Sequence, residues 1–116
     1  LYPLRYDPEQ FSGLSRDDFL RALRKEGVPC SSVYHEQYFD GLLDEAINSD
    51  GYKRLFSAKR LKDYRDSFED LKGNRQVCAT TVGIPQSVLL ARRGDMDHII
   101  EGIRKIHAHS AALAKA

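Results

Sequence analysis

The spacing of apolar residues predicts a strand, a helix and a short second strand over the first third of the chain. Residues 1–6 alternate as a half-buried strand does, and Pro3 restricts that strand to the edge of a sheet. Ser15 stands where a helix N-cap residue would, with Asp18 three positions later as in a capping box. Gly27 is placed to end this helix in the left-handed conformation, and "VPCSSV" follows as a short strand.

The middle of the chain changes from an amphipathic pattern to a mostly charged one. Between Glu36 and Asn48 the apolar residues recur every three or four positions, which predicts a short helix or helical turn despite Gly41. Residues 50–76 carry charges of both signs in alternation, with only a sparse apolar stripe. We expect a charged insertion here, either a surface helix or a mobile segment.

The last third predicts a core strand and then the longest helix of the chain. β-branched and apolar residues favour a strand around residues 81–84, which ends at Pro85. We expect Asp95 to cap a long C-terminal helix. The apolar face of this helix comprises Met96, Ile99, Ile100, Ile103, Ile106 and either Ser110 or Leu113. Together these elements predict an α+β fold, a two-layer α/β sandwich with a small sheet of about three strands packed by helices.

Bulk composition narrows the classes of function. A chain of 116 residues is the size of a single domain, and 18 basic against 17 acidic side chains leave a net charge of +1. The charges are interleaved, which argues against a nucleic-acid partner. No apolar run approaches the roughly 20 residues of a membrane span, and no signal peptide pattern occurs, so we expect a cytoplasmic protein without a membrane partner. Cys30 and Cys78 lack metal-ligand spacing, so neither a zinc site nor a disulfide scaffold is indicated.

The candidate chemistry is sparse. No phosphate-binding glycine loop, zinc-protease motif or serine-hydrolase motif occurs in the sequence. His35 stands in an apparent turn between Tyr34 and Tyr38. One interpretation is a turn whose aromatic rings pack on the neighbouring helix, and the other is a loop that faces a substrate. Composition alone leaves both open, although structural histidines outnumber catalytic ones.

Four segments occur in a familiar order: "YDPEQFSGLSRDDFLRALRKEGVP", "VYHEQY", "VGIPQSVLL" and "GDMDHIIEGIRKI". In order and spacing they resemble the C-terminal small domain of the DegT-type sugar aminotransferases. These are pyridoxal-phosphate enzymes of the aspartate-aminotransferase fold that act on nucleotide-linked keto sugars. The resemblance covers nearly the whole chain, and its most specific parts are the helix-to-strand passage "SRDDFLRALRKEGVP" and the ending "IPQSVLL…DMDHIIEGIRKI".

The resemblance implies that residues 1–116 are the small domain of a longer enzyme. The Schiff-base lysine and the cofactor-binding aspartate would lie in a large domain upstream, so this chain alone would neither hold pyridoxal phosphate productively nor transaminate. The small domain would close over a nucleotide-sugar and support a homodimer. The family segment that faces the substrate falls on Tyr34 and His35, with Tyr38 beside them. This chain has "SSVYHEQY" where the family more often has a glycine–aromatic turn and a later histidine.

Other interpretations stay open at this point. A relative that dehydrates a sugar, or that has a regulatory role, would share the same small domain, because the lysine that separates these activities lies elsewhere. A free-standing α/β protein-interaction module is the alternative from another class, docking through its charged helix or its isoleucine-rich terminal helix. An RNA-binding sheet is disfavoured, because the predicted strands lack the aromatic and basic residues that it needs.

Overall fold

The computed structural model describes residues 2–115, so Leu1, which the sequence places in the first strand, lies outside the described part. The chain forms two compact units. Unit 1 combines the residues up to Val33 with those from Ala79 onward, and unit 2 is Tyr34–Cys78. The expected charged insertion, residues 50–76, lies wholly within unit 2.

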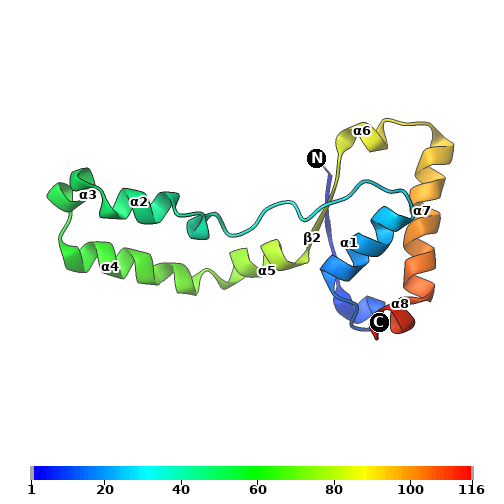
Figure 1. The fold of residues 1–116 in the computed structure, drawn as a ribbon, viewed down its shortest axis with the longest axis horizontal. Coiled ribbons are helices and arrows are strands. Elements are labelled where there is room, and N and C mark those ends of the chain that lie inside the picture. The colour runs from blue at the N-terminus through cyan, green and yellow to red at the C-terminus, as the bar shows by residue number, and fades with distance from the viewer. Residues whose placement is uncertain (1, 116) are drawn as a thin grey trace. The chain divides into compact units, whose positions relative to one another are not determined.

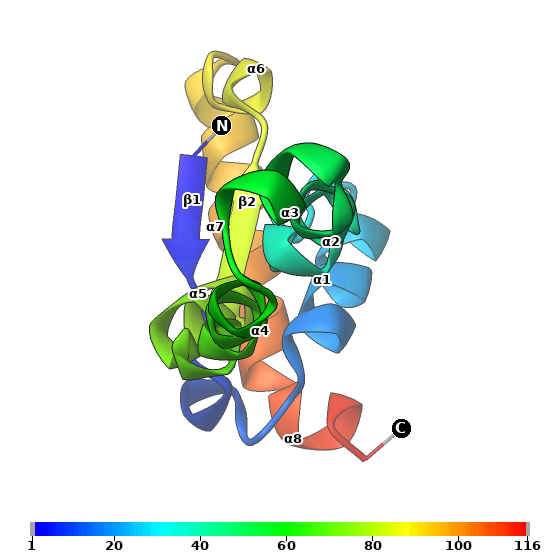
Figure 2. The ribbon, with the colours of Figure 1, turned by 90° about the vertical axis from the view of Figure 1, so that its left-hand side faces the viewer.

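Unit 1 is built around two antiparallel strands, β1 (Tyr2–Arg5) and β2 (Thr81–Ile84), which lie side by side in Figure 2. The N–H of Tyr6 donates to the carbonyl of Thr80 at 2.8 Å, which fixes the alternation of hydrogen-bonded pairs along the strands. This alternation turns the backbone of Pro3 away from β2, where its missing N–H breaks no ladder bond. Both strands, and the edge position of the first, are as the sequence predicts.

The third expected strand is absent from the described sheet, which has two strands rather than about three. The segment after the first helix makes only an isolated antiparallel bridge between Ser31 and Gly83, with N–H to O distances of 3.0 and 2.8 Å. Two local features prevent this segment from pairing further with β2. Pro29 has no N–H to donate, and the carbonyl of Cys30 accepts a hydrogen bond from the Arg24 guanidinium at 3.0 Å instead of from a strand.

Two helices of unit 1 lie on the same side of the sheet and contact each other: α1 (Arg16–Lys25) and α7 (Arg93–Ala108) (Figure 1). Shorter elements complete the unit: η1 (Pro8–Phe11), α6 (Gln86–Leu89) and α8 (Ser110–Leu113). Gly102 of α7 permits the close approach, because a Cβ there would lie 3.4 Å from the Cβ of Glu26. The core of unit 1 comprises Tyr6, Leu14, Phe19, Leu20, Leu23, Val28, Cys30, Val82, Ile84, Ile99 and Ile106.

Both ends of α1 are as predicted. The Ser15 hydroxyl accepts the N–H of Asp18 at 3.1 Å and so caps the first turn. At the other end Gly27 has φ of +86°, and the N–H of Val28 reaches back to the carbonyl of Leu23 at 3.1 Å. This is the Schellman arrangement, which satisfies a carbonyl that the helix would otherwise leave unpaired.

The start and the buried face of α7 differ from prediction. Arg92, not Asp95, is the N-cap residue; the Asp95 carboxylate lies in the first turn and accepts the N–H of Arg92 at 3.0 Å. A carboxylate is favourable there, because it faces the partial positive charge of the helix N-terminus. Ile100 is 45% exposed. It follows Ile99 by about 100° around the helix, so the two cannot both face the core directly.

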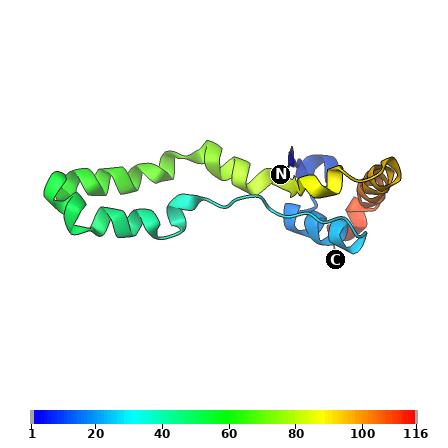
Figure 3. The same ribbon diagram turned by 90° about the horizontal axis from the view of Figure 1, so that it is seen from above.

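Unit 2 is helical throughout its ordered elements, and α2 and α3 contact α4 in it (Figure 3). Its elements are η2 (Gln37–Phe39), α2 (Leu42–Asn48), α3 (Asp50–Leu55), α4 (Ala58–Asp66), η3 (Ser67–Asp70) and all but the last two residues of α5 (Lys72–Thr80). Gly41, with φ of +88°, separates η2 from α2 within the predicted helix. A small core joins Tyr38, Ile47, Leu61 and Phe68. Within residues 2–115, no helix combines the length and apolar composition needed to cross a bilayer.

Candidate functional site

The loop that begins unit 2 presents two of the three predicted substrate-binding residues to solvent. Tyr34 is 65% exposed, and the side chain of His35 is 74% exposed. The third residue, Tyr38, lies in η2 and is only 5% exposed. The structure therefore brings Tyr34 and His35 together on one accessible loop. Tyr38, which follows them in the sequence, is instead part of the unit 2 core.

Tyr38 combines aromatic packing with an unpaired polar group. Its ring lies 5.5 Å from that of Phe68 and 4.6 Å from that of Phe39, between ring centroids. Its hydroxyl is buried and has no hydrogen-bond partner within the described residues. Leaving a buried hydroxyl unpaired costs free energy, so a ligand atom or water that reaches it gains a hydrogen bond. The ring packs in the core of unit 2, and the hydroxyl is buried with it, so neither part of Tyr38 is open to a substrate in this conformation.

His35 is held by a residue that sequence reasoning missed. Its Nε2 is hydrogen-bonded to Oδ1 of Asp40, five residues later. The 3-10 turn η2 brings the carboxylate back toward the imidazole. In the sequence, a carboxylate that comes just after an expected turn was the feature that could have pointed to Asp40 as a partner of His35. The carboxylate orients the imidazole and favours a proton on Nε2. Among residues 2–115, Nδ1 then has no hydrogen-bond partner. Such an imidazole can hydrogen-bond a hydroxyl or an anionic oxygen.

The base of this loop is fixed by an ion pair between two helices. The Arg65 guanidinium of α4 binds the Asp44 carboxylate of α2 in bidentate fashion, with Nε–Oδ1 at 2.5 Å and Nη2–Oδ2 at 3.2 Å. The same guanidinium lies over the rings of Phe39 and Phe68, 5.7 and 5.2 Å from their centroids. Bidentate geometry and cation–π contact together restrict Arg65 to one orientation. The helices that follow the His35 loop, α2 and α4, are therefore held together by this ion pair.

Arg75 brings positive charge to the same part of unit 2. Its Nη1 donates to Oε2 of Glu69 at 3.0 Å. This hydrogen bond is the main cause that raises the pKa of Arg75 above its usual value, and the charges of Tyr38 and Glu36 act in the same direction. Arg75 therefore stays protonated at every physiological pH and supplies a fixed cation near Tyr38.

The described residues do not fit the requirements of a pyridoxal-phosphate site. A Schiff-base lysine needs a desolvated pocket that lowers its pKa. Every lysine of the chain is exposed: Lys25, Lys53, Lys59, Lys62, Lys72, Lys105 and Lys115. Among residues 2–115, no group of three or more His, Cys, Asp or Glu side chains is placed to hold a metal ion.

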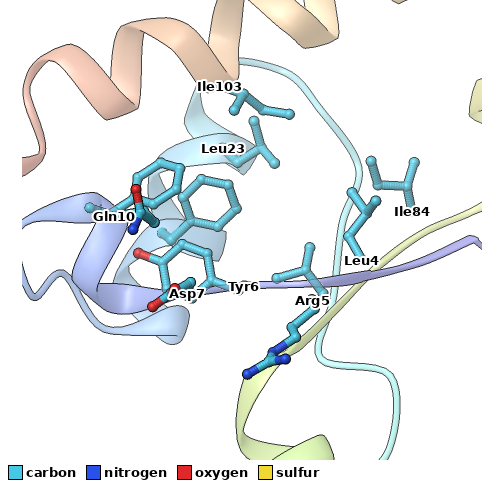
Figure 4. Close-up of a pocket in the computed structure, with 11 residues that line it drawn as sticks. Leu4, Arg5, Tyr6, Asp7, Gln10, Leu23, Ile84 and Ile103 are labelled. Atoms are coloured by element: carbon cyan, nitrogen blue, oxygen red, sulfur yellow. The ribbon is translucent and has the colours of Figure 1, made fainter.

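Unit 1 contains a separate apolar cavity of about 280 Å³. Figure 4 shows Leu23 and Ile103 on one side of it and Leu4 and Ile84 on the other. Polar groups, among them Arg5, also line it. No catalytic set converges on this cavity, so it fits an apolar group better than a reacting substrate.

Comparisons with known proteins add nothing to this site. No protein-family model matches the chain, and no curated protein and no solved structure matches it. Its function is therefore inferred from its motif order, from the His35–Asp40 pair and from the exposure of its lysines.

Proposed function

We propose that this chain is the small domain of a DegT-type, pyridoxal-phosphate-dependent sugar aminotransferase. It would close the active site over a nucleotide-sugar, support a homodimer and have no activity alone. The order of the four resembling segments carries the proposal. The folded chain is compatible with it, because three of the segments supply successive parts of unit 1: η1 leading to α1, the end of β2 followed by α6, and α7.

The cofactor in this proposal is held by a large domain that this chain lacks. Pyridoxal phosphate would supply the electron sink for transamination, and it would need a lysine and an aspartate from that domain. The exposure of all the lysines here is consistent with this division. The apolar cavity of unit 1 offers a place where a side chain of the large domain can be buried, which would secure the small domain to it.

Within the small domain, the substrate-facing residues would be Tyr34 and His35. The exposed Tyr34 ring can stack on a planar or apolar face of the substrate, and Nδ1 of His35 can hydrogen-bond a sugar hydroxyl or a phosphate oxygen. Asp40 acts through His35 as a positioning residue. Tyr38 would contribute by supporting the loop that carries Tyr34 and His35, since its ring packs in the core and its hydroxyl is buried. Tyr34 and His35 bind substrate and take no part in bond making.

Steady-state kinetics of the native polypeptide test this assignment. We expect His35→Asn and Asp40→Asn each to raise KM for the sugar substrate about tenfold, the effect of losing roughly 1.4 kcal/mol of binding, with kcat changed less than threefold. His109→Asn, an exposed histidine of unit 1, is the matched control and should leave both constants unchanged. An unchanged KM in both loop variants would remove His35 and Asp40 from the substrate site.

One observation favours the alternative function, a free-standing protein-interaction module. Unit 2 exposes several large apolar side chains, Leu42 at 71% and Leu55 at 76% among them. Clustered apolar exposure marks interaction surfaces in general, with or without an attached enzyme domain. The two functions differ in the length of the native polypeptide: a start within a few residues of Leu1 would favour the module, and a chain roughly three times longer would favour the enzyme.

A further inference from the structure

Unit 2 is a helical hairpin whose two ends carry opposite charge. We define its tip as residues 49–62 and its stem as residues 34–48 with 63–78. The tip holds five basic side chains and one acidic one, and the stem holds eight acidic side chains and three basic ones. The tip cations are Lys53, Arg54, Lys59, Arg60 and Lys62, and its one acid is Asp50. The hairpin is therefore electrically polarised along its length.

Several of these charges have no partner within unit 2. Arg54 and Arg60 at the tip form no ion pair among residues 2–115, and neither do Glu45 and Asp70 in the stem; all four are exposed. By contrast Lys59 and Lys62 are paired to acids one turn along α4. Among residues 2–115, the charges without an ion pair are thus mainly cations at the tip, Lys53, Arg54 and Arg60 against Asp50, and mainly anions in the stem, Glu36, Glu45 and Asp70 against Lys72.

Apolar side chains are exposed at both ends of the same hairpin. The small core of unit 2 leaves most of its aromatic residues only partly covered. At the tip, Tyr52, Phe56, Arg60 and Leu61 line a hollow of about 170 Å³, together with Tyr64 from the adjoining end of the stem. Phe39 and Leu42 in the stem are 51% and 71% exposed. Each end thus offers apolar surface to bury and charge of one sign to neutralise.

We propose that unit 2 is a dimerisation element that pairs antiparallel with unit 2 of a second copy of this chain. A two-fold interface must be self-complementary, because each contact from one copy to its partner is repeated in reverse. Antiparallel pairing sets the basic tip of each copy against the acidic stem of the other. A parallel pairing would instead place like charges together, and their repulsion would oppose association.

The proposal gives structural form to the dimer support in the proposed function. It rests, however, on the charges and exposed side chains of unit 2 alone and not on pyridoxal chemistry. A second copy is the occupant that these features specify, because the surface complements itself. An unrelated partner would need only one of the two charge signs.

Charge reversal tests the pairing in the 116-residue chain. We expect the tip variant Arg54→Glu/Arg60→Glu and the stem variant Glu45→Lys/Asp70→Lys each to raise the dimer dissociation constant at least tenfold, measured by sedimentation equilibrium. Lys25→Glu/Arg104→Glu reverses two exposed cations of unit 1 and should leave the constant unchanged. Circular dichroism of each variant establishes that it is folded.

Mixing the two reversed variants tests the antiparallel geometry directly. The two carboxylates gained by the tip of one variant then face the two lysines gained by the stem of the other, and the remaining tip and stem keep their natural residues, so a heterodimer should form at near wild-type affinity. Formation of that heterodimer, with loss of both homodimers, supports the proposal. A wild-type chain that stays monomeric, reversed variants that dimerise normally, or a mixture that stays monomeric would each overturn it. None of these results depends on whether the native enzyme carries a cofactor.

Discussion

Replacing Gly27 by alanine should destabilise unit 1 through backbone conformation alone. Gly27 has φ of +86°, and an alanine Cβ would meet nothing nearer than Nε2 of His98 at 3.9 Å, an ordinary contact. The left-handed conformation costs an L-residue about 1–2 kcal/mol, and the restricted unfolded chain of alanine offsets about 0.4–1 of this. We therefore expect Gly27→Ala to lower the free energy of unfolding by about 1 kcal/mol, since steric strain adds nothing.

Urea unfolding followed by circular dichroism measures this loss, and a thermal scan should show a fall in Tm of roughly 4–8 °C. Gly27→Asn should cost less than the alanine variant, because asparagine tolerates the left-handed region. Gly94→Ala, at an open position inside α7, should be neutral or stabilising by up to about 1 kcal/mol. If Gly27→Ala were as stable as the wild type, or Gly94→Ala equally destabilised, the assignment of the α1 terminus would be refuted.

Three further changes probe the core and the ion pair. Leu23→Ala removes a fully buried side chain and should cost about 3 kcal/mol in urea unfolding; a loss below about 1 would contradict its core position. The Tyr6 hydroxyl donates to the carbonyl of Leu14 at 2.9 Å, and burial, with a smaller effect of the neighbouring Asp7, raises its pKa from 10.0 to about 12. The folded state then keeps a proton that the unfolded chain releases, so the stability supplied by Tyr6 is complete below pH 10 and is lost as pH rises toward 12. Tyr6→Phe should cost about 1 kcal/mol at pH 7, and the difference from wild type should shrink above pH 10; a constant difference would contradict the shift. A double-mutant cycle on Asp44→Ala and Arg65→Ala should give a coupling of about 0.5–1 kcal/mol that weakens in salt, and zero coupling would remove the brace between α2 and α4.

The predictable parts of the fold are those set by local chemistry. The cap at Ser15, the left-handed glycine at Gly27 and the strand end at Pro85 each follow from what one residue type can do with its own backbone. The predicted third strand failed because strand pairing depends on partners that the sequence does not reveal. Its Cys30 carbonyl is taken by Arg24, a competition that is invisible until the end of α1 is placed.

The candidate site divides in the same way. That Tyr34 and His35 lie on an exposed loop was predictable from the turn signals around them. The burial of Tyr38 was not, because it depends on Phe68, thirty residues later, which packs against its ring. Asp40 was missed because a 3-10 turn brings back a side chain that lies five residues away, outside the spacings by which helical and strand neighbours are recognised. The misplaced cap of α7 arose because an aspartate is favourable both at the N-cap and in the first turn.

In the function that we propose, this chain is the small domain of a larger enzyme, and the large domain of that enzyme supplies the cofactor site. Borohydride reduction of the native protein, followed by peptide mass spectrometry, would locate any lysine joined to pyridoxal phosphate. The account predicts a single labelled lysine in a polypeptide that also contains residues 1–116, at a position outside them. A label on one of the lysines of this chain, or a native polypeptide that begins near Leu1 and carries no label, would contradict it.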